Sequence, residues 1–277
     1  MPLTAAVVGH VEWIEFGRVD HVPAAGEILH VSDSWEEPGG GGAVAAVQLA
    51  KLAGEATLYT ALGDDAVGHR CKTELEALGV RVEAVFRPEP QRRGYVHVDS
   101  AGERTITVIG SRLGPAGDDA LPWDDLERTD AVYLTAGDVG AIQAARAART
   151  LVSTTRGLET LRESGVELDA LVASARDPGE LYETGELNPA PRYVMRTAGP
   201  AGGEYEGADG ARGRWEATPL PGPISDLYGC GDSFAAGLTY GLGAGLAVAE
   251  ALRLGARCGA ACATGRGPYA GQLSSAG

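Results

Sequence analysis

Apolar residues recur along the chain in short strand-like runs separated by runs with helical spacing. Strands are expected at Ala5–Val8, Thr57–Leu62, Ala131–Leu134, Leu151–Thr154, Ala170–Ala173 and Tyr193–Arg196. Helices are expected at Ala43–Leu52, Val67–Leu78, Val139–Arg149 and Gly179–Tyr182. Alternation of strand and helix predicts a mainly parallel sheet that is covered by helices on both faces.

Two segments depart from this alternation. Residues Arg93–Gly110 alternate apolar and polar side chains on both sides of the turn residues DSAG, which predicts a β-hairpin. The segment Val11–Ser34 is also strand-like and has its own turn residues, PAAG. The two pieces together predict a small second sheet that covers the main one, although a plain edge hairpin is the alternative.

Composition narrows the class of protein. The chain has 277 residues, 44% of them hydrophobic, and a net charge of -15, which suits a globular protein of one or two domains. The acidic balance argues against a nucleic-acid-binding protein, while a local pocket can still bind an anion. We expect no leader and no membrane span, and the four cysteines form no CxxC pair, so a reducing cytoplasm is the expected location.

The stretch YGCGDSFAAG, Tyr228–Gly237, contains the strongest chemical signal. A carboxylate, Asp232, follows three small residues where a helix is expected to begin. A helix N-terminus attracts negative charge, so Asp232 could be an ordinary cap. The flanking glycines favour a second interpretation, because they allow the backbone to approach a ligand closely.

Four glycines, Gly39–Gly42, precede the first expected helix. Such a run can cradle an anion, or it can be a turn that permits close helix packing. Two common phosphate-binding motifs are absent from the sequence. Lysine occurs only at Lys51 and Lys72, neither after a glycine, and the first strand is followed by GHVEWIE rather than by G-x-G-x-x-G.

Taken together, these motifs resemble the ribokinase-like (PfkB-type) carbohydrate kinases. The late family signature D-T-x-G-A-G-D-x-F is matched by DLYGCGDSF, Asp226–Phe234, and the early Gly-Gly stretch by Gly39–Gly42. The N-x-x-E motif is matched by DPGE and the T-x-G-x-x-G stretch by TAGPAGG. The resemblance implies one kinase domain over residues 1–277, with a lid formed from about 11–36 and 92–110. It also implies ATP and Mg²⁺, and leaves a monovalent cation open.

The resemblance assigns roles to the phosphoryl-transfer residues. Asp232 would be the catalytic base, and the backbone of Gly229, Cys230 and Gly231 would form an anion hole. This assignment agrees with general chemistry, since preorganised N–H donors stabilise a transferred phosphoryl group and a carboxylate can accept the hydroxyl proton. The nucleotide would contact Thr197, Gly199 and Gly202, and the metal would be associated with Glu180 and Asp177.

At the substrate end the sequence departs from the family pattern. Val44 stands where the family has an asparagine, Ile14 stands where many members have an aspartate, and the substrate is therefore left open. We expect Glu12 to bind a sugar hydroxyl, although it could instead begin a lid strand and face solvent. The other expected substrate contacts are Gly39, Gly40, Gly41, Gly42 and Arg104, with His10 as a further candidate.

Three functions follow from these residues. The first is an ATP-dependent transfer of phosphate to a sugar or sugar-like molecule. The alternatives are a nucleoside kinase of the same superfamily and a non-catalytic ligand-binding protein on the same scaffold. The strand pattern at Tyr95–Val98 and Thr105–Ile109 also suggests a homodimer formed through the lid, because an exposed sheet edge needs cover or a partner.

Overall fold

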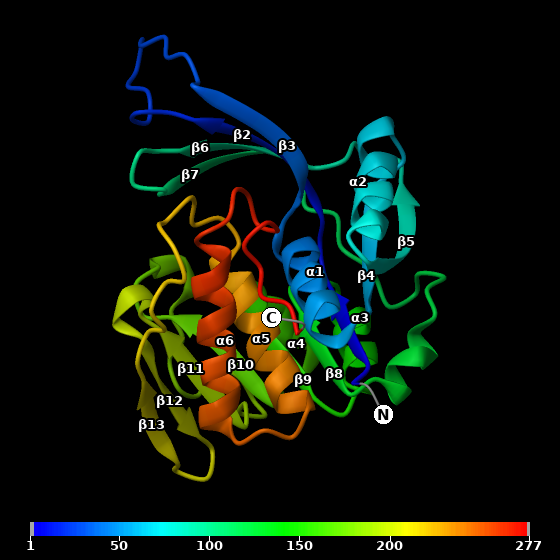
Figure 1. Ribbon diagram of the computed structural model, residues 1–277. Helices are drawn as coiled ribbons and strands as arrows, with labels where there is room; N and C mark the ends of the chain where they lie inside the picture. The colour runs from blue at the N-terminus through cyan, green and yellow to red at the C-terminus, as the bar shows by residue number, and fades with distance from the viewer. Residues whose placement is uncertain (1–2, 276–277) are drawn as a thin grey trace.

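The computed structural model describes residues 3–275, so the predicted domain limits at residues 1 and 277 lie outside the described residues. A nine-stranded sheet forms the centre, in the order β13-β12-β11-β10-β9-β8-β1-β4-β5 (Figure 1). Its strands are β1 Ala5–Val8, β4 Ala56–Gly63, β5 Val80–Arg87, β8 Ala131–Leu134, β9 Leu151–Thr154, β10 Ala170–Ser174, β11 Tyr193–Thr197, β12 Gly203–Gly207 and β13 Arg212–Trp215. All neighbouring pairs from β5 to β11 are parallel, and β12 and β13 continue the sheet in antiparallel pairs.

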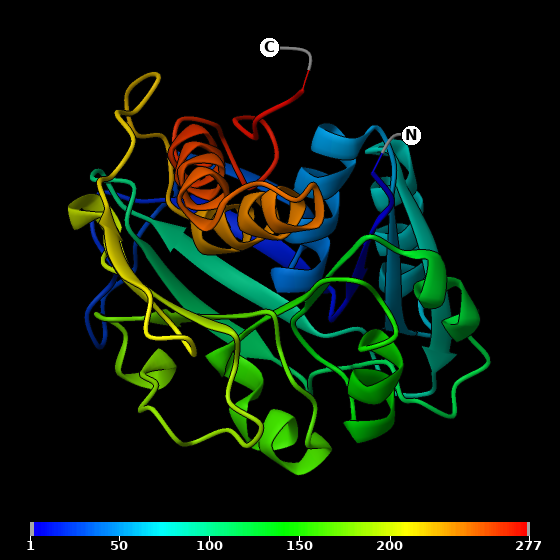
Figure 2. The ribbon, with the colours of Figure 1, turned by 90° about the horizontal axis from the view of Figure 1, so that it is seen from below.

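Helices cover both faces of this sheet (Figure 2). One face carries α1 Gly41–Ala53, α2 Ala66–Ala77, α5 Cys230–Gly243 and α6 Val248–Cys262, and the other carries α3 Val139–Ala145 and α4 Leu158–Ser164. The side chains of β1 alternate between two hydrophobic clusters, because Ala5 and Val7 pack on the first face while Ala6 and Val8 pack on the second. A strand buried on both faces therefore reads as a continuous apolar run.

A second, four-stranded sheet has the order β3-β2-β6-β7 and lies above the main sheet in Figure 1. Its strands are β2 Glu12–Arg18, β3 Asp33–Gly39, β6 Arg93–Val98 and β7 Arg104–Ile109. We call this sheet the lid. The predicted fold class, a doubly wound parallel sheet with a small β-sheet lid, is confirmed.

Several predicted elements differ in detail. Helix α3 ends at Ala145 instead of Arg149, because the chain turns to enter β9 at Leu151. The helix expected at Gly179–Tyr182 is only a 3-10 turn, Pro178–Glu180, which ends where Leu181 adopts an extended backbone. Within the segment Val11–Ser34, only Glu12–Arg18 and the first two residues of β3 are in strands, since β3 begins at Asp33 and runs directly into the glycine run.

The parallel topology determines where a ligand can bind. The carboxyl ends of β1, β8, β9, β10 and β11 lie at the same edge of the sheet, since these strands are parallel to one another. Ligands of doubly wound sheets bind in the crevice outside this edge. Apart from Arg104, which begins lid strand β7, the predicted site residues lie at or after the ends of these strands or close to the start of a helix.

Candidate active site

Asp232 lies in the first turn of α5, which begins directly after Gly229. Gly229 adopts a left-handed backbone, with φ of 80°, and a side chain there would come within 2.9 Å of Val44 Cγ1. The first N–H groups of a helix have no carbonyl partner within it, so those of Cys230 and Gly231 are available to an anion. The turn and the following carboxylate therefore provide donors and an acceptor at one point.

The neighbourhood of Asp232 changes its acidity. Burial raises the pKa of this carboxyl to about 6, against the opposing effect of Arg156, while Glu180 raises it further. A carboxyl with this pKa is ionised at neutral pH and is a far better proton acceptor than an ordinary aspartate.

The glycine run lies against Asp232. A methyl group added at Gly41 would lie 2.8 Å from Asp232 Oδ1 and 3.5 Å from Thr135 Cγ2. At Gly40 it would meet His10 Cδ2 and Glu12 Cγ, at 3.1 and 3.2 Å. The missing side chains thus allow the start of α1 to approach the residues that follow β1 and β8 and the first turn of α5 at once. This agrees with the interpretation of the glycine run as a turn that permits close packing.

Glu12 is buried, with 7% of its surface exposed, although it does begin lid strand β2. Its Oε1 lies 2.8 Å from Arg92 Nε, whose N–H is not aligned for a hydrogen bond, and 3.7 Å from His10 Nε2. Burial raises the pKa of Glu12 and lowers that of His10 to about 3, so the histidine is neutral. Glu12 therefore points into the protein and not to solvent, and it already has a cationic neighbour.

The predicted metal residues both lie beside Arg156. Glu180 contacts this arginine, and Asp177 Oδ2 lies 3.9 Å from Arg156 Nη2. Asp177 is half exposed and also accepts a hydrogen bond from Gly179 N–H at 2.9 Å. Within residues 3–275, no group of three His, Cys, Asp or Glu side chains could hold a metal ion unaided. This donor set suits a cation whose other ligands are phosphate oxygens and water, as is usual for Mg²⁺.

The predicted nucleotide residues lie at the end of β11. Gly199 and Gly202 have φ of 58° and 78° and enclose a short 3-10 turn, and the Thr197 hydroxyl donates to Ala173 O at 3.2 Å. A surface hollow beside them is lined by Ala175, Arg176, Ala198, Pro200 and Ala201. The glycines thus shape a turn next to an open surface, while Thr197 is used within the sheet.

The lid reaches the same edge of the sheet. Arg104 is exposed on β7, and its charge lowers the pKa of both Asp226 and Asp232. The Leu227 N–H donates to Gly102 O at 3.0 Å, and Phe16 packs edge-on against the Tyr228 ring. The lid is therefore in contact with the segment that leads into α5.

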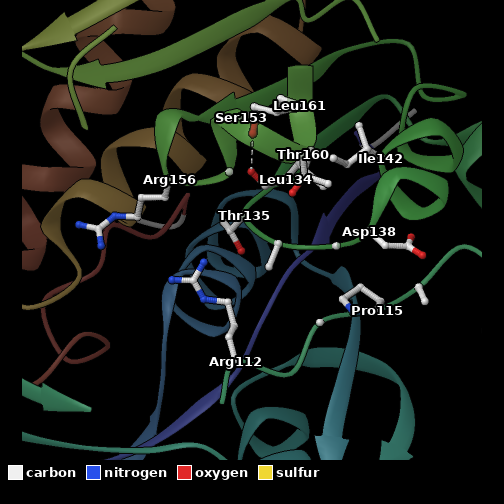
Figure 3. A pocket seen from close by; sticks show the side chains of 15 residues that line it. Arg112, Pro115, Leu134, Thr135, Asp138, Ile142, Ser153, Arg156, Thr160 and Leu161 are labelled. Atoms are coloured by element: carbon white, nitrogen blue, oxygen red, sulfur yellow. Dashed lines mark hydrogen bonds between the residues drawn. The ribbon is translucent and has the colours of Figure 1, made fainter. Parts of the chain in front are cut away.

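A cavity of about 340 Å³ opens at the ends of β8 and β9 (Figure 3). Its polar lining includes Arg112, Thr135, Asp138, Ser153 and Arg156. Thr135 connects this cavity to Asp232, since both residues flank Gly41. The cavity is therefore adjacent to the candidate base.

The comparisons with known proteins identify the family. Residues 3–172 and 205–275 match the family model described as pfkB family carbohydrate kinase. The chain belongs to the PfkB family of carbohydrate kinases. The predicted family and class of activity, ATP-dependent phosphotransfer to a sugar or sugar-like molecule, are confirmed, and nothing favours a non-catalytic scaffold.

Individual relatives agree with this membership. An ATP-dependent ribose-1-phosphate kinase from Halopiger xanaduensis is 28% identical over 249 residues, which cover 83% of this chain and 81% of the relative. A microbiome-derived acarbose kinase has a TM-score of 0.80 at 21% identity, covering 99% and 96% of the two chains. The ribokinase of Arabidopsis thaliana, complexed with ribose and ATP, has a TM-score of 0.76 at 21% identity, covering 98% and 96%.

The match to the PfkB family leaves out residues 173–204. That segment contains five predicted site residues: Asp177, Glu180, Thr197, Gly199 and Gly202. Their roles therefore depend on their positions in this structure, and they remain proposals.

Sequence reasoning did not single out several residues of this PfkB site. Tyr228 accepts a hydrogen bond from Gly40 N–H at 2.9 Å, and the fully buried Asp226 accepts from the N–H groups of Tyr228 and Gly267, at 3.0 and 2.6 Å. Both residues lie within the DLYGCGDSF signature, so the signal was present. Arg112 and Arg156 carry no motif and are brought to the site only by the fold.

Proposed function

We propose that Asp232 is the catalytic base of a sugar kinase that uses ATP. The carboxylate accepts the proton of a sugar hydroxyl while that oxygen forms a bond to the γ-phosphorus, and ADP leaves as the old oxygen–phosphorus bond breaks. The N–H groups of Gly229, Cys230 and Gly231 stabilise the negative charge that spreads over the transferred group. The observation that carries the proposal is the raised pKa of Asp232 beside the N-terminus of α5 and the glycine run.

The nucleotide is proposed to lie over the end of β11. Thr197, Gly199 and Gly202 would line its phosphate end, and the neighbouring hollow with Arg176 would accommodate the rest. Glu180 would hold Mg²⁺ through water, with Asp177 nearby, and the ion would neutralise charge on the phosphates. The side chain of Glu180 is 20% exposed, and its charge raises the pKa of Asp232. Both observations support a position of Glu180 beside the reacting groups.

The acceptor is proposed to be a sugar bound beside the glycine run and Glu12. Glu12 would accept hydroxyl hydrogen bonds on the oxygen that does not face Arg92, and neutral His10 would add a further contact. Val44, which stands where the family has an asparagine, is fully buried against Gly229. This position therefore packs within the protein and does not contact a nucleobase. This observation favours a sugar over a nucleoside.

Two broader properties remain proposals. The exposed apolar side chains Ile106, Val108 and Ile109 on β7 suit a homodimer formed through the lid. The chain is proposed to act in the cytoplasm. Among the helices within residues 3–275, none has the length and hydropathy needed to cross a membrane.

A panel assay tests the proposed function. Purified protein, ATP and Mg²⁺ are incubated with ribose, fructose, ribose 1-phosphate and adenosine, and ADP release is measured. We expect ADP release with at least one sugar and none with adenosine. Release with adenosine alone would replace the sugar kinase by a nucleoside kinase, and release with none of the acceptors would contradict the proposal for these substrates.

A further inference from the structure

Strand β8 brings a buried tyrosine hydroxyl close to the candidate base. Tyr133 is the one polar residue of this strand, whose sequence is AVYL, and it is 0% exposed. Its hydroxyl makes no hydrogen bond within residues 3–275. Buried polar groups without a partner are uncommon in native proteins, so this hydroxyl needs an explanation such as a bound water.

The ring of Tyr133 lies on the face of the sheet that carries the active-site helices. It packs in the hydrophobic cluster under α1 and α5, and α5 packs on both β8 and β9. Thr135, two residues further along the chain, lies on the same side beside Gly41, whose other neighbour is Asp232. Tyr133 therefore lies beneath the first turn of α5.

The charges around the Tyr133 hydroxyl are those of the proposed reaction. Burial raises the pKa of Tyr133 most, the charges of Asp232 and Glu180 add to this effect, and Arg156 opposes it. On β9 the register partner of Tyr133 is Val152, and the chain continues from there to Arg156, which contacts Glu180. The hydroxyl is thus close to both carboxylates.

The carboxylate of the base is not held in place by the protein alone. Among residues 3–275, no hydrogen bond or ion pair reaches the Asp232 side chain, whereas Glu180 contacts Arg156. The charge of Glu180 also raises the pKa of Asp232. A group that donates to both carboxylates would fix the orientation of Asp232 and reduce the repulsion between the two charges.

We propose that Tyr133 is a positioning residue for the base, and that its hydroxyl donates to a buried water that in turn donates one hydrogen bond to Asp232 and one to Glu180. This inference rests on the proposed function, since it concerns the orientation of the carboxylate that accepts the sugar proton. A water with these three partners satisfies the buried hydroxyl, because a water can accept one such bond while it donates two. The second oxygen of Asp232 stays free for the substrate.

A hydroxyl that holds a water and a hydroxyl without a partner respond in opposite ways to removal. Tyr133→Phe deletes the hydroxyl and keeps the ring. Without a partner, the hydroxyl is costly to bury, so the variant would have a higher free energy of unfolding than the wild type. If the hydroxyl holds the water, its loss lowers the free energy of unfolding and removes a hydrogen bond from the ionised form of Asp232.

Carbon NMR of the aspartate carboxyl groups measures the pKa of Asp232 without any substrate, and Asp232→Asn assigns the signal. We expect Tyr133→Phe to raise this pKa by about 0.5–1, because a hydrogen bond to the ionised form favours that form. The other charges that act on Asp232 are the same in the variant and the wild type: Arg156, Glu180, Arg104 and Glu12.

Kinetics provide a second reading, with an acceptor from the panel of ribose, fructose, ribose 1-phosphate and adenosine. In Tyr133→Phe the acidic limb of kcat/KM should move to higher pH, since the base is then protonated at a higher pH. At neutral pH, kcat should fall about two- to tenfold, while the KM for ATP stays the same.

The matched control is Tyr59→Phe. Tyr59 is 2% exposed on the neighbouring part of the sheet, but its hydroxyl donates to Pro122 O at 3.4 Å and its ring packs in the other hydrophobic cluster. This variant should leave the pKa of Asp232 and the acidic limb unchanged.

An unchanged pKa of Asp232 in Tyr133→Phe would overturn the proposal, and so would a gain in the free energy of unfolding. Failure of Tyr133→Phe to fold would assign the hydroxyl to the core and would overturn it as well. A raised pKa in this variant, together with a wild type that transfers no phosphate, supports the water and contradicts Asp232 as a kinase base. Normal phosphate transfer with an unchanged pKa does the reverse.

Discussion

At the scale of single residues, the pKa of Asp232 determines how the rate should depend on pH. Burial raises this pKa to about 6, and a base must be ionised to accept a proton. We expect kcat/KM to be constant at neutral pH and to fall about tenfold per unit below pH 6. A pH–rate profile measures this, and an acidic limb near pH 4 would show that Asp232 is an ordinary exposed carboxylate or not the base.

Two neighbours of Asp232 should move this limb in opposite directions. Glu180 raises the pKa of Asp232 and Arg156 lowers it, so Glu180→Gln should shift the acidic limb to lower pH and Arg156→Gln to higher pH.

Glu180→Gln should also raise the Mg²⁺ concentration needed for half-maximal rate. An unchanged Mg²⁺ dependence would remove the metal role of Glu180 and leave only its electrostatic one.

At the scale of elements, the start of α1 has two adjacent glycines with different tasks. A side chain at Gly41 would meet Asp232 Oδ1 at 2.8 Å, whereas one at Gly42 would meet His10 O and Gly9 C, at 2.6 and 2.9 Å. Gly41→Ala should therefore lower kcat at least tenfold with little change in the free energy of unfolding. Gly42→Ala should lower the free energy of unfolding by about 1–3 kcal/mol, because the backbone of β1 must move away from α1.

Chemical denaturation and steady-state kinetics on both variants check this pair. The positions are adjacent and receive the same methyl group, so each variant is the control for the other. A Gly41→Ala variant with wild-type kcat would mean that the base is not held against the glycine run.

The elements also show how far the sequence predicts the fold. The apolar runs of β1, β4 and β8–β11 were predictable because a parallel strand that is buried on both faces needs continuous apolar residues. Strands β12 and β13, GEYEG and RGRW, were missed because they are short, polar and paired at the antiparallel edge. Helix α6 was missed as an element, although Cys258 and Cys262 are one helical turn apart in the sequence and both lie on its buried face.

The candidate site was predictable where its residues are contiguous. Asp232 and the glycine run are local motifs, whereas Arg92, Arg112 and Arg156 converge only because the start of β6 and the ends of β7 and β9 lie near one another. No local pattern marks such a cluster. Its recognition required the long-range topology of the lid and the main sheet.

At the scale of the whole molecule, the lid determines the expected assembly. Strand β7 is the free edge of the lid sheet and is exposed along its length, including Ile106, Val108 and Ile109, at 42%, 43% and 49%. We expect a dimer in analytical ultracentrifugation, and Val108→Lys should shift it toward monomer, because a charge on an edge strand opposes pairing. Sedimentation of the wild type as a monomer at micromolar concentration would contradict the dimer.

The central claim is that Asp232 takes the proton during phosphoryl transfer, and single-turnover kinetics test it most directly. Enzyme in excess over ATP is mixed with a substrate identified by the panel assay, and γ-phosphate transfer is timed for the wild type, Asp232→Asn and a control variant. The control is Asp124→Asn, which alters an exposed carboxylate in the 3-10 turn Trp123–Arg128. We predict that Asp232→Asn binds ATP as the wild type does but transfers phosphate about 10²- to 10⁴-fold more slowly. Transfer by Asp232→Asn at the wild-type rate would contradict the account.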